Sequence, residues 1–238
     1  MTLRQGHAAM SGCRPSVIMG LVLLGSLSAL ASPQASSLPD WEAIMTSMGL
    51  VDVQSVHKDI RVELKYSSAD NFLGRDVYGS LERCFLCKEA ARKLAAAQDR
   101  LTDLKPGWRL LVFDGARPRR IQTLMWEIVK GTPQQKYVAN PATGSNHNYG
   151  ASVDLTIVDA DGRSLDMGTV FDFFGDLAQP RHEEDFLKQG KLSEGQVENR
   201  RLLRKIMADA GFFSISTEWW HFDAFPRDEI RKRFAIIE

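Results

Sequence analysis

Apolar and polar residues alternate along residues 60–66, and this pattern predicts a half-buried strand. Residues 108–113 and 151–158 are rich in apolar and β-branched side chains, so we expect strands of the core there. Residues 81–101 instead carry apolar side chains at helical spacing, which predicts an amphipathic helix. The same criteria predict helices over 41–48, 118–129 and 197–210, a helix or tail over 227–233, and strands over 51–56, 164–167 and 212–222.

This mixture of elements predicts an α+β fold, with a small antiparallel or mixed sheet and helices packed against one side of it. The chain has 238 residues, of which 44% are hydrophobic, and this is enough for one domain with a sizeable core. Lys+Arg and Asp+Glu both number 30, so the net charge is zero. That balance gives no indication of nucleic-acid binding, and we expect no nucleic-acid partner.

The N-terminus has the pattern of a signal peptide. Arg4 and Arg14 precede an apolar run over 17–30, and Ala29-Leu30-Ala31 supplies a small-x-small cleavage site. We expect a signal peptide over 1–31 and a single mature domain over 32–238. The run is too short for a comfortable transmembrane helix, although an uncleaved anchor is the alternative. The mature protein is then periplasmic or secreted, with no stable insertion in the membrane.

Cys84 and Cys87 are the two cysteines left after this cleavage, and they form a Cys-x-x-Cys. In an exported protein they could form a disulfide or a redox pair. No second cysteine pair completes a structural zinc site. Without a thioredoxin-like pattern around them, the composition favours two small apolar residues on the predicted helix over 81–101.

Two short polar stretches carry the candidate chemistry. The first, over 145–154, contains His147 in a loop and Asp154 in the predicted strand that follows. The second, over 218–223, contains Glu218 and His221. Two imidazoles and one carboxylate could hold zinc with a position left for water, and the second carboxylate could serve as a base. The same donors could also accept other divalent ions.

The sequence leaves the geometry of these stretches open. Glu218 and His221 would share one face of a helix, but on a strand they would point to opposite faces unless a bend intervenes. Each stretch also has a simpler interpretation, since a histidine beside a strand or a Glu and a His around two tryptophans can serve packing alone. Asp154 is harder to dismiss, because a buried carboxylate without a partner is costly.

Taken together, the two stretches resemble the zinc D-alanyl-D-alanine peptidases. That family carries Ser-x-His-x-x-Gly-x-x-x-Asp followed much later by Glu-x-x-His, and within it the D-alanyl-D-alanine dipeptidases are the most similar over about 59–223. The resemblance implies one Zn²⁺ per chain held by His147, Asp154 and His221, with Glu218 as catalytic base. It also implies hydrolysis of D-alanyl-D-alanine or a similar D,D-dipeptide.

Further residues take roles from the same resemblance. Asp-Gly-x-Arg-Pro over 114–118 makes Arg117 the stabiliser of the transition state, although Arg117 could instead pair with Asp114. Met-Gly-x-x-Phe-Asp over 167–172 makes Asp172 the binder of the substrate ammonium, with a structural salt bridge as the alternative. Ser145 and Tyr66 are further substrate-binding candidates, and Tyr66 could equally be a tyrosine of the core.

Two other functions share these motifs. A zinc D-alanyl-D-alanine carboxypeptidase would trim longer peptidoglycan peptides, and it would need an open cleft where Asp172 lies. A non-enzymatic module could use the metal only to bind wall peptides, but Glu218 and Arg117 are not needed to hold a metal. Export points to the turnover of peptidoglycan fragments, unlike the cytoplasmic role of the best-known dipeptidases.

Overall fold

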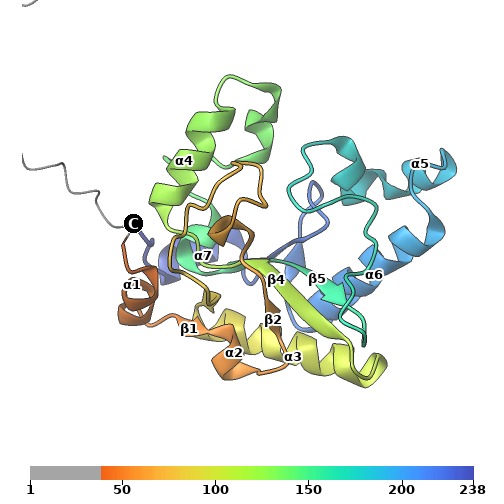
Figure 1. Ribbon diagram of the computed structural model, residues 1–238, viewed down its shortest axis with the longest axis horizontal. Coiled ribbons are helices and arrows are strands. Elements are labelled where there is room, and N and C mark those ends of the chain that lie inside the picture. Colours follow the sequence, from red (N-terminus) through yellow and green to blue (C-terminus); the bar gives the residue numbers. More distant parts are fainter. Residues whose placement is uncertain (1–38) are drawn as a thin grey trace, which may run out of the picture. The chain divides into compact units, whose positions relative to one another are not determined.

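A mixed five-stranded sheet organises residues 39–238, which are the residues that the computed structural model describes (Figure 1). Strand β2 runs parallel to β4, and the other neighbours in the order β2-β4-β5-β7-β6 are antiparallel. The strands are β2 (Arg61–Val62), β4 (Arg109–Asp114), β5 (Ser152–Val158), β6 (Phe213–Ser214) and β7 (His221–Asp223). The predicted α+β fold with a mixed sheet is therefore confirmed.

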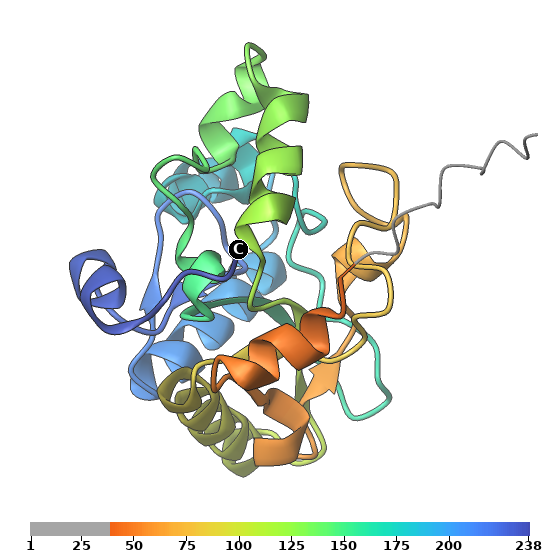
Figure 2. The same ribbon diagram turned by 90° about the vertical axis from the view of Figure 1, so that its left-hand side faces the viewer.

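The central strand β5 has two chemically different faces. Val153, Leu155 and Ile157 alternate with polar residues and join the hydrophobic core. Asp154 and Thr156 point to the opposite face, and both are buried as well. Figure 1 shows α3 (Lys88–Leu104) and α6 (Glu194–Asp209) below the sheet, and Figure 2 shows α4 (Arg119–Val129) rising on the other side. The carboxylate of Asp154 is therefore buried on the face of β5 that lies opposite the hydrophobic core.

Several predicted elements are found with small shifts at their ends. Helices α4 and α6 match the expected ranges, and the terminal segment forms a helix rather than a tail. Strands β4 and β5 also lie where the apolar runs predict them. The remaining helices of the described chain are α1 (Trp41–Ser47), α2 (Val53–Val56), α5 (Glu183–Lys188) and α7 (Arg227–Arg233), with 3₁₀ turns η1 (Lys65–Ser67), η2 (Pro133–Tyr137), η3 (Asn146–Tyr149), η4 (Asp176–Ala178) and η5 (Pro180–His182).

The helix predicted over 81–101 begins seven residues late, at Lys88. The residues before it form β3 (Phe85–Leu86), which pairs with β1 (Val51–Asp52) in a second small sheet. The apolar side chains of Phe85 and Leu86 lie in this small sheet and pack in the core, and they do not form the apolar face of a helix. Cys84 and Cys87 flank β3, so the prediction that they lie on a helix is wrong. Both thiols are buried and free, and no disulfide joins them.

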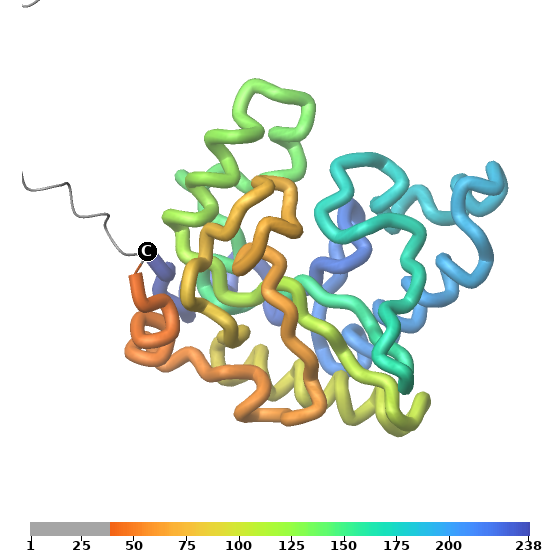
Figure 3. Tube along the Cα trace, in the orientation of Figure 1, coloured from red at the N-terminus to blue at the C-terminus, as the bar shows by residue number. Residues whose placement is uncertain are grey.

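Three predicted strands are shorter than expected. The strand over 60–66 ends at Val62, and the strand over 164–167 is a single bridge between Val158 and Ser164. The strand over 51–56 gives way to α2 after Asp52. Figure 3 traces the two long excursions that replace strand in these regions, one in orange to gold after β2 and one in teal after β5. Both excursions carry residues that line the site described below.

The last predicted strand, over 212–222, is interrupted. Its ends form β6 and β7, and residues 215–220 between them contain bends in place of a continuous strand. Residues 39–238 lie within one compact unit. None of the helices within 39–238 has the length and apolarity that crossing a membrane requires. The predicted signal peptide over 1–31 and mature start at Ser32 lie outside the described residues, so both stay predictions.

Candidate metal centre and active site

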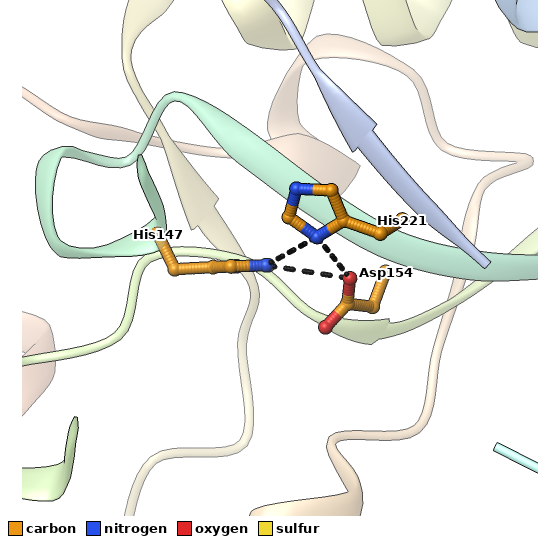
Figure 4. Close-up of side chains that lie close together, drawn as sticks. All are labelled: His147, Asp154 and His221. Carbon is orange, nitrogen blue, oxygen red and sulfur yellow. Dashed lines mark hydrogen bonds and ion pairs between the residues drawn. The ribbon is translucent and has the colours of Figure 1, made fainter. Parts of the chain in front are cut away.

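Three side chains from distant segments meet at one point beside β5 (Figure 4). Asp154 lies on β5 directly opposite His221, the first residue of β7, and His147 comes from η3 just before β5. His147 Nε2 lies 3.1 Å from His221 Nδ1 and 3.3 Å from Asp154 Oδ1, and the latter two atoms are 2.9 Å apart. All three residues are buried.

These separations fit a tetrahedral metal ion. Zinc binds imidazole nitrogen and carboxylate oxygen at roughly 2.0–2.2 Å, which places neighbouring ligand atoms of a tetrahedron about 3.3 Å apart. The three distances between the ligand atoms, 2.9 to 3.3 Å, approach that spacing. Two nitrogens and one carboxylate oxygen form a catalytic donor set that leaves one position for water. The predicted group His147, Asp154 and His221 could therefore hold a metal ion.

Outer partners fix the orientation of both imidazoles. His147 Nδ1 donates to the carbonyl oxygen of Gly115 at 2.7 Å, which leaves Nε2 free to bind a metal. His221 Nε2 donates to Asp223 Oδ1 at 3.0 Å, so its Nδ1 faces the centre. Asp223 also accepts a hydrogen bond from the hydroxyl of Ser152. The two histidines thus present different ring nitrogens because their outer partners lie on different sides.

The turn that carries His147 is built for this position. The hydroxyl of Ser145 caps η3, and the side chain of Asn148 completes a reciprocal capping box. Gly150 ends the turn with φ of +62°, and a Cβ there would lie 2.7 Å from the side chain of Leu50. A side chain at this position would be both strained and crowded. This explains the glycine three residues after the histidine.

The cluster is electrostatically suited to a cation. Burial alone would raise the pKa of Asp154, but the charges and hydrogen bonds of the two histidines hold it well below its usual range. Burial lowers the pKa of His221, but Asp154 and Asp223 outweigh this effect and raise it well above the usual value. A proton and a metal ion therefore compete for Nδ1 of His221, and metal binding should release protons.

Asp223→Ala should weaken zinc binding by about 10- to 100-fold, because His221 loses the acceptor that orients its ring. Asp223→Asn keeps an acceptor oxygen and should lose less. Competition against a chelator of known affinity measures both constants. Equal zinc affinity in Asp223→Ala and the unmodified protein would show that this carboxylate does not orient the ligand.

The bend between β6 and β7 brings Glu218 to the same cavity as the ligands. A regular strand would have turned Glu218 and His221 to opposite faces, so the bend resolves the geometry that the sequence left open. Burial of the carboxyl in the cavity raises the pKa of Glu218 to about 7, despite the opposing effect of His221. A carboxylate with a pKa near neutrality is suited to accept and return a proton.

Arg117 pairs with Asp114 and also lines the cavity. Its Nε and Nη2 lie 2.8 and 2.6 Å from Asp114 Oδ2, and Nη1 donates to Gln122 at 3.0 Å. Nη2 also lies 3.5 Å from Asp154 Oδ2. Asp114 accepts a further hydrogen bond from Tyr78 at 2.7 Å. The ion pair with Asp114 does not exclude a role for Arg117 in the site. This ion pair holds the guanidinium of Arg117 at the wall of the cavity.

Asp172 and Tyr66 meet at another wall of the cavity. The Tyr66 hydroxyl donates to Asp172 Oδ2 at 2.7 Å, and both residues line the cavity with Ser145. Burial raises the pKa of the Asp172 carboxyl well above its usual range. Asp172 is the one non-glycine residue of the described chain with positive φ, at 58°. Such a conformation is costly and often found at functional sites. No salt bridge to Asp172 is found within 39–238.

The cavity has a volume of about 390 Å³ and includes every site residue predicted from the sequence. Three partners of the site were not among the residues predicted from the sequence: Asp223, Gln122 and the carbonyl of Gly115. Asp223 lies two residues after His221, so the period of a strand could have placed both on one face. The contacts made by Gln122 and Gly115 depend on tertiary structure, and no local pattern indicates them.

Comparisons with known proteins agree with the site. The family model of the D-ala-D-ala dipeptidases matches residues 46–235. A D-alanyl-D-alanine dipeptidase of Escherichia coli (strain K12) is 37% identical over 174 residues, covering 73% of this chain and 83% of the relative. A protein of the same name from Enterococcus faecalis (strain ATCC 700802 / V583) is 30% identical over 191 residues, covering 73% of this chain and 90% of the relative.

A third relative, from Streptomyces coelicolor (strain ATCC BAA-471 / A3(2) / M145), has the same name and is 34% identical over 188 residues, which cover 71% of this chain and 88% of the relative. The matched region runs through all the segments that build the cavity, from Tyr66 to Arg227. The chain therefore belongs to the D-ala-D-ala dipeptidase family of peptidases.

Proposed function

We propose that this protein is a zinc-dependent dipeptidase that hydrolyses D-alanyl-D-alanine, or a similar D,D-dipeptide, to free amino acids. The names of the relatives support the substrate class. The observation that carries the proposal is the joint position of the donor cluster, Glu218 and Arg117 on one cavity. A metal-binding module without catalysis would not need a carboxylate of raised pKa beside three ligands.

In the proposed reaction His147, Asp154 and His221 would hold a zinc ion, which would supply Lewis-acid chemistry by lowering the pKa of water and polarising the scissile carbonyl. Glu218 takes a proton from the attacking water and returns it to the nitrogen of the leaving amine. The guanidinium of Arg117, held by Asp114 and Gln122, stabilises the negative charge that develops on the carbonyl oxygen. His147, Asp154 and His221 hold the ion, and the outer partners of the histidines keep them oriented.

Asp172 provides the selection for a free dipeptide in this proposal. The ammonium group of a bound dipeptide would favour the ionised form of the Asp172 carboxyl and pair with it, and Tyr66 holds one of its oxygens in place. A longer peptide has an amide at that position and offers no positive charge. This disfavours the carboxypeptidase alternative, which needs an open path past Asp172. Ser145 would contribute its hydroxyl to substrate binding at the edge of the same cavity.

We further propose that the protein acts after export, in the periplasm or outside the cell, on dipeptides released from peptidoglycan. The apolar run over 17–30 and the small-x-small site before Ser32 support this placement. An exported enzyme would meet fragments of the wall rather than the precursor pool. Fractionation of cells that make the full chain, together with the N-terminal sequence of the mature protein, tests the location and the cleavage site.

Removal of the metal should abolish turnover, and one equivalent of Zn²⁺ per chain should restore it. The measurement is release of D-alanine from D-Ala-D-Ala by chelator-treated protein during titration with zinc. Titration with Mn²⁺ or Co²⁺ in parallel tests whether zinc is preferred, since the donor set can accept other divalent ions. Full activity of the metal-free protein would contradict the proposed mechanism.

A further inference from the structure

A free dipeptide carries a carboxylate as well as an ammonium group, and a cationic side chain in the site could pair with that carboxylate. Among residues 39–238, two arginines and no lysine line the cavity of about 390 Å³. Arg117 is already engaged, because Asp114 and Gln122 take its Nε, Nη1 and Nη2 groups and Asp154 lies close by. The other arginine is Arg227, the first residue of α7.

Arg227 is exposed and forms no ion pair with any carboxylate of residues 39–238. Its Nη2 donates to the carbonyl oxygen of Gly144 at 3.2 Å. This bond places the guanidinium beside the turn that begins at Ser145 and carries His147. The remaining N–H groups of the fork have no protein acceptor in the described chain, and a guanidinium matches a carboxylate with two parallel hydrogen bonds.

We propose that Arg227 binds the C-terminal carboxylate of the dipeptide substrate. The assignment rests on the proposed function, and it gives the cavity two charged sites of opposite sign. Asp172 receives the ammonium and Arg227 receives the carboxylate, and Glu218 and the metal ligands line the same cavity as both of them. A zwitterionic dipeptide would be bound through its ammonium and its carboxylate. Arg227 is a binding residue that takes no part in proton transfer.

The test uses a matched pair of substrates, D-Ala-D-Ala and its C-terminal amide D-alanyl-D-alaninamide. Arg227→Gln should raise KM for the free acid by about 10- to 100-fold with little change in kcat, because a hydrogen-bonded charge contact is lost from binding. KM for the amide should change little, since it offers no carboxylate to Arg227. Arg227→Lys keeps the charge without the fork and should fall between these values.

Arg231→Gln is the matched control. Arg231 lies one helical turn after Arg227 on α7 and donates to the neighbouring carbonyl, that of Thr143. It does not line the cavity. Its replacement removes a similar anchor of the 143–144 backbone without removing a cation from the site. We expect this variant to keep the KM values of the unmodified protein for both substrates.

Direct binding separates this proposal from the proposed reaction. In zinc-loaded protein with Glu218→Gln, calorimetry should show weaker binding of the amide than of the acid, and adding Arg227→Gln should remove that difference. An equal loss for acid and amide, or an equal loss in Arg231→Gln, would overturn the assignment of Arg227. If the unmodified protein turned over neither substrate but the charge-dependent difference persisted, the proposed hydrolysis would fail and the carboxylate site would stand.

Discussion

Glu218→Gln should lower kcat for D-Ala-D-Ala by about 10³-fold while the protein still binds one zinc ion per chain. The amide of Gln cannot accept the proton of the attacking water, and a positioned general base contributes roughly 10²- to 10⁴-fold. The variant should also lose the acidic limb of the pH profile of kcat/KM. That limb should lie at or below pH 7, because burial raises the pKa of Glu218 to about 7 and a bound cation favours its ionised form.

The control for this variant is Glu198→Gln. Glu198 lies on α6, is exposed and forms no ion pair within the described chain, so kcat should not change. Zinc content and circular dichroism of both variants exclude metal loss and misfolding as causes. Full turnover by Glu218→Gln would refute the role of this carboxylate as base, and loss of zinc from the same variant would make Glu218 a ligand.

His221→Ala should lose zinc and all turnover together. The change removes the ligand that lies 2.9 Å from Asp154 Oδ1 and 3.1 Å from His147 Nε2, so two of the three donors remain. We expect zinc affinity to fall by more than the roughly 10- to 100-fold that loss of an outer partner causes. Equilibrium dialysis with metal analysis gives the affinity, and D-alanine release gives the turnover.

His182→Ala is the corresponding control, because His182 lies outside the cavity and contacts Arg181 and Phe186 instead. It should keep both zinc and activity. The role assignment would be reversed if Glu218→Ala lost the metal while His221→Ala retained it. Retention of zinc by both Glu218→Ala and His221→Ala would show that His221 is not a ligand and that the ion binds elsewhere.

The sequence predicted the parts of the fold that local patterns determine. Strands β4 and β5 follow from continuous apolar runs, and α6 follows from its helical spacing. The helix predicted over 81–101 starts later in the structure, because Phe85 and Leu86 are apolar residues of β3, which pairs with β1. A buried strand of two residues cannot be distinguished from helix by periodicity alone.

The motifs over 145–154 and 218–223 predict which residues form the metal site, but they do not predict how these residues are arranged in space. Motif spacing could not show that the chain bends between β6 and β7, although this bend brings Glu218 to the cavity. The motif around Arg117 likewise did not settle whether the side chain pairs with Asp114 or faces the site, and it does both. No local pattern indicates Arg227 as a residue of the site, because its place in the cavity depends on how α7 packs near Gly144.

The most direct test of the central proposal compares release of free D-alanine from D-Ala-D-Ala and from an N-acylated peptide that ends in D-Ala-D-Ala. Both substrates are given to the zinc-loaded mature protein under the same conditions. We expect cleavage of the free dipeptide alone, because Asp172 binds an ammonium group that the acylated peptide lacks. Cleavage of the acylated peptide at a comparable rate would contradict the dipeptidase assignment and place the protein among the carboxypeptidases.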